Sequence, residues 1–147
     1  MSVRSHFSEG DKIQIKNAIR AAELNTSGEV RVHIEKHCKE DVLDRAAYIF
    51  EKLEMHKTEL RNGVLFYLAI EDRKFAILGD AGINQKVPEN FWDEIKENML
   101  TRFKEGNFTN GLSEGIIEAG KQLKMHFPHQ QDDVNELSDE ISFGEKE

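Results

Sequence analysis

The sequence predicts an α/β fold, a three-layer α/β/α sandwich around a small mixed β-sheet. Three observations favour it. Residues 29–34 ("EVRVHI") alternate between polar and apolar, and residues 64–70 ("VLFYLAI") are apolar on both faces, as in a central strand covered on both sides. Segments with apolar residues at helical spacing flank these strands. The length of 147 residues suits a single domain, predicted over residues 1–127.

The first helix is predicted to begin after Ser8, which can cap it together with Asp11. Its apolar stripe consists of Ile15, Ala18, Ile19 and Ala22. Residues 25–28 ("NTSG") end this helix, and the strand at 29–34 follows. We expect its apolar side chains to face a core and its polar side chains to face away. The outward positions are Glu29, Arg31 and His33.

A second helix is predicted after Asp41, with the stripe Leu43, Ala46, Ala47, Phe50 and Leu53. The strand at 64–70 and the run at 74–78 are joined by the short polar segment 71–73, which indicates an antiparallel hairpin. The crossover between the strands at 29–34 and 64–70 predicts that these two are parallel.

Two further helices complete the order α-β-α-β-β-α-α. Pro88 is expected to open the third helix at its first position, after a loop at 79–87. Its buried face should contain Phe91, Trp92, Ile95, Met99 and Phe103. The last helix carries Leu112, Ile116, Ala119 and Leu123.

Residues 128–147 form an acidic tail. From His129 onward the tail has seven acids and one base, so it carries six of the net charge of −8. Its low apolar content predicts disorder. The rest of the chain is nearly neutral and has no basic stripe, which argues against nucleic acid as a partner.

The sequence contains no sign of a membrane or secretory context. No stretch approaches the roughly 20 apolar residues of a membrane span. The N-terminal residues lack the apolar run of a signal peptide. Cys38 is the only cysteine, so no disulfide can form within the chain. We therefore expect a cytoplasmic location.

The predicted topology brings three loops to one edge of the sheet. The strands at 29–34 and 64–70 begin at that edge, and the hairpin strand ends there. The loops supply four candidate oxygen ligands for a hard cation, Ca²⁺ or Mg²⁺, namely Glu29, Glu59, Asn62 and Asp80. Arg61 adds a cationic group that could hold an anion. The glycines around Asp80 would let backbone carbonyls come close to an ion.

Other interpretations compete with this cation site. Asp, Asn and Gly also serve simply to turn a chain. His33, His37 and Cys38 resemble soft-metal ligands, but no second pair of ligands completes a tetrahedron, and Cys38 beside His37 is a poor nucleophile because adjacent side chains point apart. None of the common nucleotide-binding, hydrolase or zinc-protease motifs occurs.

The sequence resembles the TPM domain family, named after a thylakoid lumen protein, a photosystem II repair factor and a nematode receptor auxiliary protein. The resemblance rests on the order of "NTSGEVRVHI", "AAYIFEKLEMHK", "RNGVLFYLAIEDRKFAILGDAGI" and "FKEGNFTNGLSEGI", and it covers about Ser8 to Leu123. It implies the same α/β/α sandwich. It also implies a groove lined by acids at one sheet edge that binds divalent cations, notably calcium, and acid phosphatase activity as claimed for a plant member.

Three functions remain open. The favoured one is a non-enzymatic binding or regulatory module that uses a bound calcium-type cation to order its loops and to recruit a protein partner. The alternative is a metal-dependent acid phosphatase with weak phosphomonoesterase activity. The third is a structural domain whose groove holds nothing specific.

Overall fold

A computed structural model of the chain describes residues 7–129 and 137–144. The helices are α1 (Glu9–Asn25), α2 (Val42–Lys52), α3 (Ala81–Lys86), α4 (Asp93–Lys104) and α5 (Phe108–Leu123), with a short 3₁₀ turn at Met55–Lys57. The strands are β1 (Glu29–Glu35), β2 (Gly63–Ala69), β3 (Lys74–Gly79) and β4 (Ser142–Phe143). The predicted fold class and the order of its main elements are confirmed.

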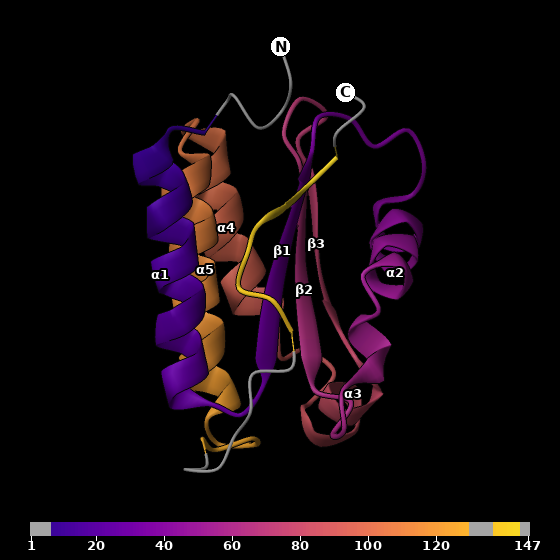
Figure 1. Cartoon of the computed structure of the whole chain (residues 1–147). Helices are drawn as coiled ribbons and strands as arrows, with labels where there is room; N and C mark the ends of the chain where they lie inside the picture. Colours follow the sequence, from indigo (N-terminus) through magenta and orange to yellow (C-terminus); the bar gives the residue numbers. More distant parts are fainter. Residues whose placement is uncertain (1–6, 130–136, 145–147) are drawn as a thin grey trace.

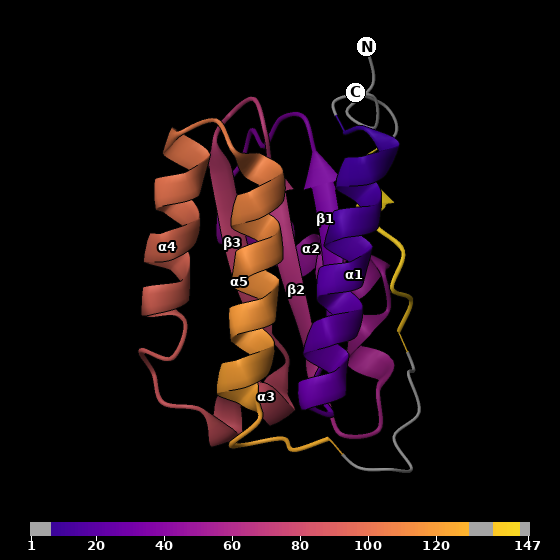
Figure 2. The same ribbon diagram turned by 90° about the vertical axis from the view of Figure 1, so that its left-hand side faces the viewer.

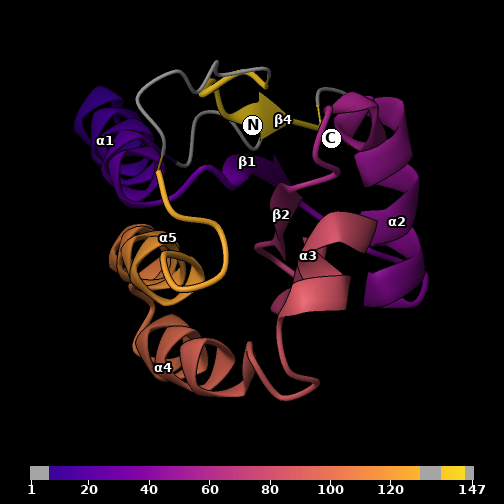
Figure 3. The same cartoon turned by 90° about the horizontal axis from the view of Figure 1, so that it is seen from below.

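The four strands form one mixed sheet in the order β3-β2-β1-β4. β1 pairs in parallel with β2, and β2 pairs antiparallel with β3, both as predicted. Helices α1, α4 and α5 cover one face of the sheet, and α2 covers the other (Figures 1 and 2). The view from below shows α3 at one end of the sheet, on the α2 side (Figure 3).

The sheet separates two apolar clusters. The larger one lies under α1, α4 and α5 and includes Val30, Phe66 and Ile116. The smaller one lies under α2 and includes Ile49, Leu65 and Ala76. β2 is buried along its whole length because its side chains enter both clusters. Among the helices of the described ranges, none combines the length and the apolar character that crossing a bilayer requires.

Two boundaries differ from the prediction. The expected loop after β3 contains the six-residue helix α3, which Asp80 caps. The expected helix does not begin at Pro88, because the carbonyls of Pro88 and Asn90 accept hydrogen bonds from Phe91 and Asp93 in two successive tight turns. α4 begins only at Asp93, after these turns.

The prediction of a disordered tail is wrong for residues 137–144. β4 pairs in parallel with β1, with Ser142 opposite His33 and Phe143 opposite Ile34. The Gly144 amide donates to the Ile34 carbonyl at 3.0 Å. Residues 130–136 and 145–147 of the predicted tail lie outside the described residues. Figure 1 shows β4 beside β1.

Residues 137–144, which we call the tail segment, also account for an error in the predicted exposure of β1. Glu29 and His33 were expected to face solvent, but they are only 4% and 5% exposed. The Leu137 amide donates to Glu29 Oε1 at 2.8 Å, and His33 Nδ1 lies 2.8 Å from Ser142 Oγ. Two polar side chains of β1, Glu29 and His33, therefore contact polar groups of residues 137–144.

Candidate functional site

The three predicted loops do meet at one edge of the sheet. In the sheet register, Glu29 lies opposite Gly63, and Val64 lies opposite Gly79. The Glu29 amide donates to the Asn62 carbonyl at 3.0 Å, and the Asp80 amide donates to the Gly63 carbonyl at 2.9 Å. The start of β1, the start of β2 and the end of β3 are thus tied together by backbone hydrogen bonds. We call this region the loop edge.

Asp80 is a buried and tightly held carboxylate of the loop edge. It is the N-cap of α3, and its Oδ1 accepts the Ala81 amide at 2.7 Å. Arg61 binds the same carboxylate through two parallel bonds, Nε to Oδ2 and Nη2 to Oδ1, both at 2.8 Å. The Asp80 side chain is 5% exposed and that of Arg61 is 50% exposed. These hydrogen bonds, with the charge of Asp80, raise the pKa of Arg61 above its usual value.

The backbone around this pair is unusually close-packed. Arg61 has a φ of 51°, in the left-handed region that side chains other than glycine seldom adopt. Its carbonyl accepts the Gly82 amide at 2.9 Å. A Cβ on Gly82 would lie 2.2 Å from the Leu60 carbonyl oxygen and 2.6 Å from that of Arg61. Glycine is required at position 82 because the backbone of α3 packs directly against the backbone of the loop before β2.

Asn62 contributes an unsatisfied oxygen to the loop edge. The residue is 3% exposed. Its Nδ2 donates to the Ser27 carbonyl at 2.7 Å, which fixes the side-chain amide, and its backbone amide donates to Thr58 Oγ1 at 3.2 Å. Within the described part of the chain, Asn62 Oδ1 is buried and has no hydrogen-bond partner. A buried oxygen of this kind costs free energy until something donates to it or coordinates it.

The other two predicted ligands are placed differently. Glu29 is buried, and one of its oxygens holds the Leu137 amide. Glu59 is exposed in the turn that precedes Arg61. In residues 7–129 and 137–144, no three His, Cys, Asp or Glu side chains gather closely enough to hold a metal ion. A cation at the loop edge would therefore depend on amide and carbonyl oxygens in addition to carboxylate.

The soft-metal candidates lie elsewhere. His37 and Cys38 follow the opposite end of β1, where His37 contacts Glu71 at 3.2 Å and Asp72 at 3.1 Å. The Asp72 carboxylate also accepts the Cys38 amide at 2.7 Å. These residues stabilise the turn between β2 and β3, and the structure does not bring them to the loop edge.

Sequence reasoning missed a buried polar network on the α2 face. Glu35, 1% exposed, accepts hydrogen bonds from Tyr67 Oη and from Arg45 Nε at 3.0 Å, and its Oε1 lies 3.1 Å from His33 Nε2. Burial would raise the pKa of Glu35, but these hydrogen bonds outweigh it and lower that pKa to about 2. Alternating polar residues along a strand are typical of a solvent face, and no pattern in the sequence distinguishes that case from this buried network.

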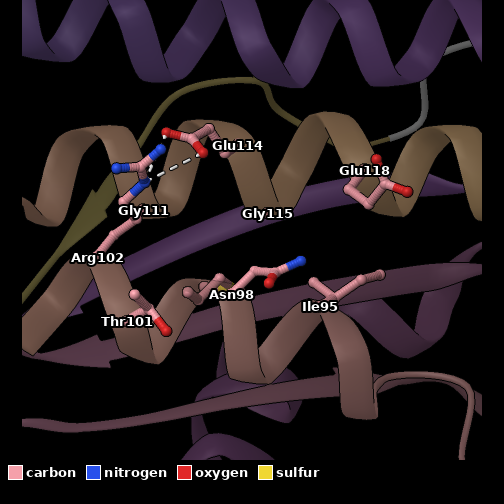
Figure 4. A pocket seen from close by; sticks show the side chains of 9 residues that line it. Ile95, Asn98, Thr101, Arg102, Gly111, Glu114, Gly115 and Glu118 are labelled. Carbon is pink, nitrogen blue, oxygen red and sulfur yellow. Dashed lines mark hydrogen bonds and ion pairs between the residues drawn. The ribbon is translucent and has the colours of Figure 1, made fainter.

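A separate groove of about 390 Å³ lies between α4 and α5 (Figure 4). Two of its charged side chains already pair with each other, since Arg102 Nε lies 3.3 Å from Glu114. The helices approach closely because α5 has glycines at 111 and 115, where a Cβ would lie 2.5 Å from Phe103 and Met99 atoms. None of the predicted site residues lines this groove.

Comparison with known proteins identifies the family. A sequence model described as the TPM domain matches residues 4–122. The chain belongs to the TPM domain family. The BA42 protein from the psychrophilic bacterium Bizionia argentinensis, solved by NMR, is 48% identical to it. That TPM-domain structure superposes with a TM-score of 0.89 over 94% of this chain and 95% of BA42.

Two more distant solution structures share the fold of this TPM domain. The N-terminal domain of a P. gingivalis protein is 20% identical, with a TM-score of 0.70 over 85% of this chain and 82% of that one. The N-terminal domain of cg2496 from Corynebacterium glutamicum is 12% identical, with a TM-score of 0.63 over 97% and 83%. No curated protein matches the sequence.

Proposed function

We propose that the loop edge of this TPM domain binds a divalent cation of the calcium type, and that the domain acts as a binding or regulatory module. The observation that carries the proposal is the buried, unpartnered Oδ1 of Asn62 among the described residues. Both chain neighbours of Asn62 bind Asp80. The Arg61 side chain donates to the Asp80 carboxylate, and the Gly63 carbonyl accepts the Asp80 amide. Coordination by a cation would supply Asn62 Oδ1 with the partner it lacks.

The chemistry of the loops suits a hard cation. Asp80 offers a carboxylate, Asn62 an amide oxygen, and the loop before β2 offers backbone carbonyls held close to α3. Calcium accepts six to eight oxygens in flexible geometry, whereas Mg²⁺ demands a nearly ideal octahedron and keeps more of its water. Few carboxylates mean little ligand charge, so we expect weak binding, in the range of about 10⁻⁴ to 10⁻³ M.

A binding role is better supported than an enzymatic one. The Arg61 guanidinium is already hydrogen-bonded to Asp80. His37 and Cys38, the imidazole and thiol considered as reactive groups in the sequence analysis, lie beyond the opposite end of β1. Recruitment of a protein partner by the ordered loops belongs to the same proposal.

The alternative, a metal-dependent acid phosphatase, is favoured by one contact: Arg61 sits next to Asp80 and could steady a phosphate beside a bound metal. An assay on a chromogenic phosphomonoester, with and without chelator, separates the two functions. Turnover that disappears both with chelator and in Asp80→Asn would favour the phosphatase. We expect no metal-dependent turnover.

A calcium titration followed by amide NMR tests the binding proposal. We expect saturable shifts at Glu29, at Asn62–Gly63 and at 79–82, and their loss in Asp80→Asn, whose side chain can still cap α3. Unchanged signals from α4 and α5 would confirm that this variant remains folded. A parallel Mg²⁺ titration reports selectivity. Shifts confined to the acidic residues beyond His129 would instead indicate loose counterion binding and contradict the proposal.

A further inference from the structure

Arg61 already occupies the carboxylate that a cation at the loop edge needs. Asp80 Oδ1 accepts Arg61 Nη2 at 2.8 Å and the Ala81 amide at 2.7 Å, and Oδ2 accepts Arg61 Nε at 2.8 Å. Each carboxylate oxygen has about two lone pairs to offer. Oδ1 is therefore fully used, and Oδ2 keeps one lone pair directly beside a guanidinium.

A cation and Arg61 cannot both use Asp80 well. Calcium binds oxygen at about 2.3 to 2.6 Å, so an ion on Oδ2 would lie within a few ångströms of the positive charge of Arg61. The cation and the half-exposed guanidinium are like charges and repel each other, and both would draw on the same carboxylate, whose side chain is only 5% exposed. Binding of the cation is therefore favoured when the guanidinium leaves Asp80.

We infer that Arg61 is an internal competitor for the cation, holding Asp80 in the empty domain and leaving it when the cation binds. This inference rests on the proposed function. It identifies Arg61 as the residue that sets the cation affinity of the loop edge. A domain with such a competitor binds the cation only at high cation concentration. Binding then also releases the Arg61 guanidinium at the surface.

The surroundings of Arg61 allow the side chain to move while the backbone stays. The side chain is half exposed, so it can turn into water without opening either apolar cluster. The backbone of residue 61 is held by the hydrogen bond from the Gly82 amide to its carbonyl. Asp80, buried and tied to α3, remains where it is.

The matched pair Arg61→Gly and Arg73→Gly tests the inference. Both arginines have left-handed backbones, with φ of 51° and 53°, so glycine suits both positions. Both variants remove one positive charge, but Arg73 lies in the β2–β3 turn at the far end of the hairpin. With Ca²⁺ as the probe, we expect Arg61→Gly to bind about tenfold more tightly than wild type, and Arg73→Gly within about twofold of it.

A second readout observes the displacement itself. In the wild-type protein, the Arg61 side-chain Nε–H is hydrogen-bonded to Asp80, so its NMR signal should exchange slowly with water. Saturating Ca²⁺ should accelerate that exchange and shift the signal. A structural role for Arg61 alone would leave both properties unchanged.

The outcomes separate the inference from the function beneath it. If wild type binds Ca²⁺ at the loop edge but Arg61→Gly binds equally or more weakly, or if the Arg61 Nε–H stays protected at saturation, the competitor role is overturned and cation binding stands. If neither wild type nor Arg61→Gly binds there, the proposed function falls together with the inference. If Arg61→Gly binds Ca²⁺ detectably and wild type does not, Arg61 competes strongly with the cation for Asp80.

Discussion

Gly82 shows how a single missing side chain positions the candidate site. The Gly82 amide donates a hydrogen bond to the Arg61 carbonyl. The heavy atoms closest to a Cβ at this position would be backbone oxygens, which cannot move away as the end of a flexible side chain could. The close approach of α3 to the loop before β2 brings Asp80 and Arg61 together. The sequence predicted a functional turn around Asp80, but not that α3 packs on Leu60 and Arg61, because that contact joins distant loops.

Gly82→Ala should destabilise the domain by about 2–3 kcal/mol, since the backbone of two loops must separate to admit the methyl group. Urea denaturation measures this loss. Gly10→Ala is the matched control, because its Cβ would meet nothing closer than Ser8 Oγ at 3.7 Å and it lies in α1. That control should be neutral or slightly stabilising. Equal effects of the two substitutions would contradict the packing account.

Glu35 provides a second prediction at the residue scale. Its folded-state pKa of about 2 lies below the ordinary value of 4.5. As the pH falls below 4.5, Glu35 takes up a proton in the unfolded chain but not yet in the folded chain. The stabilisation by Glu35 is therefore fully present above about pH 4.5 and is lost as the pH falls towards 2. Glu35→Gln should lower stability at pH 7 by about 3 kcal/mol, because Arg45 and His33 lose their buried partner.

The measurement is the free energy of unfolding from pH 2 to pH 7. In Glu35→Gln the difference from wild type should shrink as the pH falls through this range. A difference independent of pH would mean that lost packing, and not the charge of Glu35, causes the destabilisation.

At the scale of elements, long periodic segments were predictable and short ones were not. The alternation at 29–34 and the apolar run at 64–70 correctly predicted β1, β2 and their pairing. α3 has six residues and β4 has two, too few for either to show a period. Composition suggested disorder in the tail, yet a few apolar residues, among them Leu137, Ile141 and Phe143, are enough to pack it onto the two clusters.

The tail segment gives a prediction for β4. Phe143 packs on Phe7 with ring centroids 6.4 Å apart and also contacts the larger cluster. Phe143→Ala should therefore weaken β4 and accelerate hydrogen exchange of the Gly144 amide, with a global loss of about 1–2 kcal/mol. Leu43→Ala, at a position that is 53% exposed, is the control. Unchanged exchange at Gly144 would show that other contacts, not Phe143, hold the segment.

At the scale of the whole molecule, the tail segment couples stability to pH through Glu23. Burial, a hydrogen bond to Asp139 and the charge of Asp139 raise the pKa of Glu23 to about 9. Between about pH 4.5 and 9 the folded chain holds a proton that the unfolded chain has lost, so stability falls as pH rises.

Glu23→Gln should remove this fall, because the amide keeps its hydrogen-bonding hydrogens at every pH. Urea midpoints at pH 5 and pH 8 measure the effect, and Glu97→Gln, an exposed carboxyl on α4, serves as the control. If wild type and Glu23→Gln lose the same stability between these pH values, Glu23 does not retain its proton in the folded state.

The three loops of the candidate site could be placed from topology alone, since a parallel pair and a returning hairpin must share an edge. What the sequence could not supply was the state of each candidate ligand. Arg61 binds Asp80, the Leu137 amide binds Glu29, and Asn62 Oδ1 has no partner among the described residues. These depend on side-chain contacts between segments far apart in the chain.

A crystal structure of the protein grown with millimolar Ca²⁺ tests the central claim most directly. We predict an ion about 2.3–2.6 Å from Asn62 Oδ1 and an Asp80 carboxylate oxygen, with the Arg61 guanidinium turned away. A loop edge without an ion at saturating Ca²⁺, with Arg61 still paired to Asp80, would contradict it.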